Sequence, residues 1–133
     1  MSNTNAPRLW LTLQLRDVPA TTAWLEAIGF TEHVTHRDDT GVVVHAEYLW
    51  PAGGGVMLGA AERAGGQTDW VQQPGGAAAY LVVADTDATF AAAVAAGGTV
   101  HYEPVDRDFG GREAAVRDPD GNLWSFGTYA PGA

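Results

Sequence analysis

The stretch DVPATTAWLEAIGFTEH at residues 17–33 returns as DTDATFAAAVAAGGTVH at residues 85–101, and this repeat decides the fold. The same offset of 68 positions carries residues 10–60 onto residues 78–128 without a gap, with 14 identities in 51 aligned positions. Average amino-acid usage would give roughly four identities, and this Ala- and Gly-rich composition slightly more. Because two copies are too few for a stacked repeat array, we expect one domain built from two similar modules. A ligand site is expected in the groove where the modules face each other.

Each module is predicted to form a strand, a helix and three further strands. Residues 9–15 read LWLTLQL, and this strict alternation is typical of a strand with one buried face. A helix over residues 19–28 begins at a proline and ends before Gly29. The remaining expected elements are strands at 30–37, 42–50, 56–59 and 79–84, a helix at 87–96, and strands at 99–104, 112–117 and 122–129. These bounds predict an α+β fold of two tandem βαβββ modules in one domain (1–133), with module 1 at about 8–61, a linker at 62–76 and module 2 at about 77–130.

Composition and charge exclude several classes of function. The net charge of -9 includes only 7 basic residues, too few for a protein that must neutralise nucleic-acid phosphates, and it disfavours anionic membrane surfaces. The sequence has no run of about 18 apolar residues and no basic start followed by an apolar stretch, so we expect no membrane span, no secretory signal and a cytoplasmic location. The absence of cysteine excludes disulfides and thiolate metal sites. The charge permits a neutral or cationic small-molecule ligand, although on its own it favours the simpler interpretation of a soluble surface.

The paired modules, together with REAAVRDPDGNLW at residues 112–124, resemble the vicinal oxygen chelate superfamily, which holds glyoxalase I, extradiol dioxygenases and bleomycin-resistance proteins. The segment His45-Ala46-Glu47 before a Pro/Gly turn, followed by VMLG at 56–59, is similar to its glyoxalase-like, bleomycin-resistance branch. The resemblance covers about residues 9–129. It implies paired half barrels whose concave faces line a ligand cavity, with helices on the convex side, and it implies a homodimer.

The alternation within each strand separates residues that face a helix from residues that face the cavity. If the leucines of residues 9–15 pack against a helix, the neighbouring side chains point inward. Trp24 and Trp124 fall on the helix-facing pattern and are expected in the core. Phe90 and Val94, four residues apart, are expected to form the apolar face of the second helix. The inward set is Trp10, Thr12, Gln14, His45, Glu47, Met57, Tyr80, Glu113 and Ser125.

The resemblance also provides a test for a metal site. Metal-dependent members place His, Gln or Glu ligands on the first and fourth strands of each module. The matching neighbourhoods here are Trp10 and Thr12, Met57 and Gly59, Ala78 and Ala79, and Leu123 and Ser125, and none offers a carboxylate or an imidazole. We therefore expect no metal and no cofactor. His45, Glu47 and Glu113 would be neighbours across the cavity if both third strands face inward, and they favour a hydrogen-bonded or general-base group over a metal site.

Aromatic residues supply the remaining candidates for ligand contact. Trp10 and Tyr80 face inward, and Phe109 lies in a loop predicted at residues 104–111. Trp50 precedes a hairpin turn and Trp70 lies in the linker, where either could stack on a planar ligand or pack at a dimer interface.

Two main hypotheses of function follow. The leading one is a metal-free, non-catalytic binding protein of the bleomycin-resistance type that sequesters a planar, neutral or cationic compound such as an antibiotic. The alternative is an enzyme, a glyoxalase-like lyase or isomerase that is metal-free with His45 and Glu47 or Glu113 as acid and base, or one with a shifted metal site. A third possibility is a vestigial cavity, with function at the dimer surface.

Overall fold

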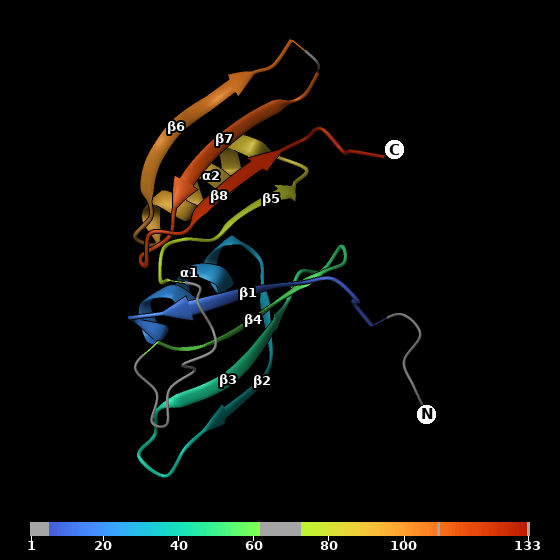
Figure 1. Ribbon diagram of the computed structural model, residues 1–133. Coiled ribbons are helices and arrows are strands. Elements are labelled where there is room, and N and C mark those ends of the chain that lie inside the picture. The colour runs from blue at the N-terminus through green and yellow to red at the C-terminus, as the bar shows by residue number, and fades with distance from the viewer. Residues whose placement is uncertain (1–5, 62–72, 109, 133) are drawn as a thin grey trace.

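The computed structural model describes residues 6–61, 73–108 and 110–132 (Figure 1). Both modules have the predicted order of strand, helix and three strands. Module 1 consists of β1 (Trp10–Leu15), α1 (Val18–Ile28), β2 (Thr31–Arg37), β3 (Val43–Leu49) and β4 (Gly55–Ala60). Module 2 consists of β5 (Ala78–Val82), α2 (Thr86–Ala95), β6 (Thr99–Asp106), β7 (Arg112–Arg117) and β8 (Leu123–Gly127). The predicted α+β class is confirmed.

The ten elements form two four-stranded sheets. Their strand orders are β1-β4-β3-β2 and β5-β8-β7-β6, so the two sheets repeat one topology. The first strand pairs in parallel with the fourth in each module, and the other pairs are antiparallel. β1 and β5 are sheet edges, and they face each other where the modules meet, with α1 and α2 behind the sheets (Figure 1).

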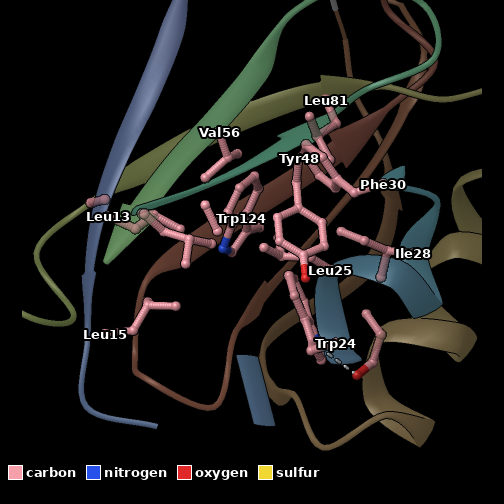
Figure 2. Packing of buried hydrophobic residues seen from close by; sticks show 14 of the residues in the cluster. Leu13, Leu15, Trp24, Leu25, Ile28, Phe30, Tyr48, Val56, Leu81 and Trp124 are labelled. Atoms are coloured by element: carbon pink, nitrogen blue, oxygen red, sulfur yellow. Dashed lines mark hydrogen bonds between the residues drawn. The ribbon is translucent and has the colours of Figure 1, made fainter. Parts of the chain in front are cut away.

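The core lies between the sheets and the helices and is shared by both modules. Trp24 of α1 and Trp124 of β8 are fully buried, with ring centroids 5.8 Å apart, as the helix-facing pattern predicts (Figure 2). The Trp24 indole Nε1 donates a hydrogen bond to the carbonyl oxygen of Ala93 in α2 at 2.9 Å. Phe30 packs edge-on against Trp124 with centroids 5.7 Å apart. The two modules therefore pack on one another within a single chain.

A buried carboxylate reinforces this contact. Asp120, in the turn between β7 and β8, accepts hydrogen bonds from the backbone N–H groups of Arg16 and Asp17 at 2.6 and 3.2 Å. It also accepts one from the Thr21 hydroxyl at 2.7 Å. Because these donors lie at the start of α1, the hairpin turn of module 2 is fastened to the helix of module 1. We call this group of contacts the Asp120 clamp.

Three sequence predictions about these elements were wrong. Leu9 was expected to face a helix, yet it precedes β1 and is 84% exposed. Val94 was expected on the apolar face of α2, yet it is 38% exposed. The buried residues of that helix are Thr86 and Ala93, which lie on a different face. The loop predicted from residue 104 begins later, since β6 continues to Asp106.

None of the helices in the described parts of the chain is long and apolar enough to cross a membrane.

Candidate functional site

A cleft of about 480 Å³ lies between the modules, where the start of β1 and most of β5 form its walls. We call it the inter-module cleft. Both modules contribute to it, and its aromatic lining residues are Trp10, Phe30, Trp50, Tyr80 and Trp124. Aliphatic side chains and the turn at residues 52–55 complete the walls, and no charged side chain is among the lining residues that the structure describes. The cleft has the size and apolar character of a small-molecule site.

Two glycines let inward aromatic rings lie flat on the neighbouring strand. Trp10 pairs with Gly55 across β1 and β4, and a Cβ atom at Gly55 would collide with the Trp10 ring. The Trp10 indole is fixed further by donating to the carbonyl oxygen of Pro7 at 3.0 Å. In module 2 a Cβ atom at Gly127 would collide in the same way with Tyr80. The strand alternation predicted that both aromatics face inward, and these glycines determine how they lie.

Trp50 closes another side of the cleft. Its ring lies 5.0 Å from that of Phe30, centroid to centroid, and stands over Gly29. Gly29 ends α1 with a φ of 124°, a conformation that only glycine adopts without strain. The end of α1 therefore positions Trp50, and the structure places this residue in the inter-module cleft.

The concave face of the first sheet carries a polar group centred on β3. The His45 ring nitrogen Nε2 lies 2.7 Å from Glu47 Oε2, and these two side chains are 39% and 27% exposed. The ring of His36 in β2 stacks on His45 with centroids 6.1 Å apart. Met57 pairs with both Glu47 and Thr12 in the strand register, so the predicted inward side chains follow one row across the sheet. Gln14, two residues along β1, pairs with Gly59.

The second sheet carries a different polar group, centred on β7. Glu113 accepts hydrogen bonds from the Tyr102 hydroxyl at 2.7 Å and from Arg107 Nε at 2.9 Å. The Arg107 guanidinium also lies over the Tyr102 ring, 5.0 Å from its centroid. Burial raises the pKa of Tyr102 and the bond to Glu113 acts in the same direction, while Glu113 raises the pKa of Arg107. Glu113 is thus held by two hydrogen-bond donors, one of which is a guanidinium.

The predicted meeting of His45 and Glu47 with Glu113 does not occur within one chain. β3 and β7 lie at opposite ends of the molecule, each separated from the line of module contact by two other strands (Figure 1). The two sheets meet at their edge strands β1 and β5. β3 and β7 therefore lie on opposite sides of this contact and far from each other. Ser125 lies in the second sheet, where its hydroxyl donates to the carbonyl oxygen of Ala79 at 3.4 Å. Trp70 and Phe109 lie outside the described residues.

The inward residues do not fit the metal centre of the superfamily. Thr12 pairs with Met57, and Tyr80 pairs with Ser125, at the strand positions where ligands would stand. Among the residues that the structure describes, no group of three or more His, Cys, Asp or Glu side chains could hold a metal ion.

Sequence reasoning missed part of the site. Phe30 and Trp124 also line the cleft, and Arg107 ties down Glu113. The glycines Gly55 and Gly127 could have indicated that an aromatic ring lies flat on each strand, since a glycine within a strand often marks a close approach by another group. Arg107 carried no such signal because it lies beyond the strand bounds that the sequence predicts.

Two βαβββ modules with a ligand-sized cleft between them define a protein of the paired half-barrel class. The family profile described as the Glyoxalase/Bleomycin resistance protein/Dioxygenase superfamily matches residues 9–126. The chain belongs to this superfamily.

Individual relatives agree with this assignment. The protein CFP32 of Mycobacterium bovis, provisionally named a glyoxylase, is 48% identical over 52 residues, which are 39% of this chain and 20% of that protein. The chain thus spans about a fifth of the length of the curated relatives it matches. The crystal structure of TioX from Micromonospora sp. ML1 has 26% sequence identity and a TM-score of 0.71, over 92% of this chain and 98% of that one. A glyoxalase/bleomycin resistance protein from Streptomyces sp. CB03234 shares the fold, with 21% identity and a TM-score of 0.65 over 89% of this chain and 96% of that one.

Proposed function

We propose that this protein binds a planar, neutral or cationic organic molecule, of the kind found among antibiotics, in the inter-module cleft and releases it unchanged. The observation that supports the proposal is the concentration of aromatic side chains around one apolar cleft: Trp10, Phe30, Trp50, Tyr80 and Trp124. A flat ring between such walls gains stacking contacts together with the burial of apolar area.

The charge of the protein supports the cationic option. The net charge of -9 produces a field that attracts cations, and indole and phenol rings bind cations on their faces. The cleft itself has no charged lining residue among those described, so a neutral ring system fits its walls equally well.

We also propose that the protein is a cytoplasmic homodimer. The inward polar groups at His45–Glu47 and at Glu113–Arg107 are each partly open, and the side-by-side sheets of one chain leave them unfaced. A second copy could bring the first sheet of one chain opposite the second sheet of the other. Light scattering coupled to size exclusion tests this: we expect about twice the chain mass of 14.0 kDa, and a monomer would contradict it.

Tryptophan fluorescence tests the binding proposal. The protein would be titrated with glycopeptide, intercalating and quinone antibiotics, as wild type and as the variants Trp10→Ala and Trp50→Ala. We expect at least one compound to bind at micromolar concentration and to lose about tenfold in affinity in either variant, a loss of about 1.4 kcal/mol. Binding by none of these compounds at micromolar concentration would contradict the proposal.

One observation favours a second candidate, catalysis. The 2.7 Å contact between His45 and Glu47 has the geometry of a general base held by a carboxylate. A glyoxalase-like lyase or isomerase activity lost in His45→Asn and kept in Trp50→Ala would favour this candidate over binding alone. Metal analysis of the dialysed protein tests the metal-dependent version of this candidate. We expect no stoichiometric zinc, nickel or iron, and finding one of these metals would favour that version.

A further inference from the structure

A second cavity lies far from the cleft, on the helix side of the first sheet. α1 leaves the outer half of this sheet uncovered, and a groove of about 500 Å³ runs there between α1 and strands β2 and β3. Its floor is made by the buried residues Val43, Ala46 and Tyr48. Tyr48 extends from β3 toward α1 (Figure 2). Thr22 on α1 and Thr35 on β2 stand on opposite walls.

The groove has opposite charges at its two ends, and we call it the dipolar groove. Arg37 pairs with Val43 at one end of the β2–β3 ladder, and Glu32 pairs with Tyr48 near the other end. Arg37 lies five positions after Glu32 along β2, a distance of about 16 Å between Cα atoms. Arg16 follows β1, the opposite edge strand, at the same end of the sheet as Arg37, and Glu26 near the end of α1 lines the groove together with Glu32.

The phenol of Tyr48 responds to both ends. Burial raises its pKa most, and a hydrogen bond with Thr22 opposes this effect. The charges of Glu32 and Glu26 raise the pKa further, whereas Arg37 lowers it. Glu26, Glu32 and Arg37 therefore act on one shared space, which Arg16 also lines.

The four charged side chains that line the groove form no ion pairs within the described residues. Within residues 6–61, 73–108 and 110–132, no salt bridge involves Arg16, Glu26, Glu32 or Arg37. The Arg16 guanidinium makes a long hydrogen bond of 3.5 Å to the carbonyl oxygen of Pro74, and Glu32 accepts one from Thr35. The nearby carboxylate of Asp38 is turned into its own loop, where it accepts hydrogen bonds from Thr40 and from the Val42 N–H.

The internal repeat shows that the scaffold does not require these charges. At the offset of 68, the counterparts of Arg16, Glu26, Glu32 and Arg37 are Ala84, Val94, Val100 and Val105, all apolar. Phe90 replaces Thr22 in the same way. In module 2 the helix packs directly on β6 and β7, whereas α1 touches β2 only sparsely. Module 1 alone thus combines an open groove with charged ends.

We propose that the dipolar groove binds an extended peptide of three or four small residues through its two charged termini. The carboxylate would lie against Arg37 and Arg16, and the ammonium group against Glu26 and Glu32. Three or four extended residues reach about 10–14 Å, which leaves room for the side chains at both ends to close on the termini. The small floor residue Ala46 favours small peptide side chains. This site is independent of the inter-module cleft.

Amide chemical shifts of the ¹⁵N-labelled protein test the proposal, with trialanine as the probe. We expect trialanine to shift the amide signals of Thr22, Ala23, Thr35 and Ala46, with a dissociation constant of about 1 mM or tighter. N-acetyl-trialanine and trialanine amide each lack one charge, and each should bind about fivefold more weakly or worse.

Charge-neutral variants assign the two ends. Arg37→Gln should lose the preference for trialanine over its amide, and the double variant Glu26→Gln/Glu32→Gln should lose the preference over the acetylated peptide. Arg8→Gln and Glu103→Gln remove exposed charges elsewhere and should keep both preferences. Unchanged groove signals at about 10 mM trialanine, or equal binding of the capped and uncapped peptides, would overturn the proposal.

Discussion

Asp120 is the single residue whose contacts most clearly join the two modules. Its buried carboxylate accepts three hydrogen bonds from the start of α1, about a hundred residues earlier in the chain. The residues Asp118-Pro119-Asp120-Gly121 between two predicted strands indicate only a hairpin turn, and Ala52, the counterpart of Asp120 in the repeat, has no carboxylate. Hydrogen-bond partners this far apart in sequence leave no periodic signal.

Removing the Asp120 carboxylate should destabilise the protein strongly. In Asp120→Ala two backbone N–H groups and a hydroxyl lose their acceptor in a buried place, and we expect the free energy of unfolding to fall by about 3 kcal/mol. Urea denaturation measures this loss. Asp39→Ala, at an exposed position, should change stability by less than about 0.5 kcal/mol, and equal effects of the two variants would contradict the clamp.

Gly55 sets the position of Trp10, and a side chain there should impair binding. In Gly55→Ala the new Cβ atom would displace the Trp10 ring from β4 into the cleft. We expect about tenfold weaker binding of the compound found by fluorescence, with a stability loss of about 1–3 kcal/mol from overpacking. Thr12→Ala, on the same face of β1 but outside the cleft, should bind like the wild type. Unchanged affinity in Gly55→Ala would show that the position of the Trp10 ring does not affect ligand binding, which contradicts this prediction.

Glu113 should control the titration of Tyr102. Burial and Glu113 raise the pKa of this phenol above its usual 10.0, so the resulting stability is present below about pH 10 and is lost as the pH rises through the folded value. In Glu113→Gln the carboxylate no longer raises the pKa, and Tyr102 should ionise at lower pH. Difference absorbance of tyrosinate follows this change. As a control, Glu113→Gln should have no such effect on the tyrosine titration in a protein that also carries Tyr102→Phe. An unchanged or higher midpoint would contradict the ion-paired group described for the second sheet.

At the scale of elements, strands were predicted well and helix faces less well. The alternation in residues 9–15 placed Leu13 and Leu15 in the core correctly, because every second side chain of a strand shares a face. On α2 the apolar residues Phe90 and Val94 predicted the buried face. Phe90 does pack against the core, but Val94 is exposed, and α1 packs at the small residue Ala93, which is fully buried. A run of alanines gives little contrast between the faces of a helix, so the sequence could not show which one α1 would cover.

Enlarging that contact should be costly. Ala93 is fully buried, and its carbonyl oxygen accepts the hydrogen bond from the Trp24 indole. Ala93→Leu would force α1 and α2 apart and should lower the free energy of unfolding by about 3 kcal/mol. Ala95→Leu, at an exposed position of the same helix, is the matched control and should change stability little. Thermal unfolding of the two variants decides, and a fully stable Ala93→Leu protein would contradict the packing.

At the scale of the whole molecule, the repeat predicted a symmetric scaffold, and the structure shows where the symmetry ends. Both modules share one topology, while the dipolar groove and each of the two inward polar groups belong to one module, and the Asp120 clamp joins the modules without a symmetric counterpart at Ala52. The repeat also predicted a ligand site between the modules, and the inter-module cleft lies there. It could not predict that His45 and Glu113 would be separated, because strand alternation fixes the face of a sheet and not the angle between two sheets.

The location of the bound ligand tests the central claim most directly. An amide chemical-shift map of the protein, with the tightest compound from the antibiotic panel, would report every residue that the ligand touches. We expect the largest shifts at Leu11, Trp50, Gly54, Tyr80 and Leu81, which line the inter-module cleft. Shifts confined to the strands around His45 and Glu47, or around Glu113, with the cleft unchanged, would contradict the account.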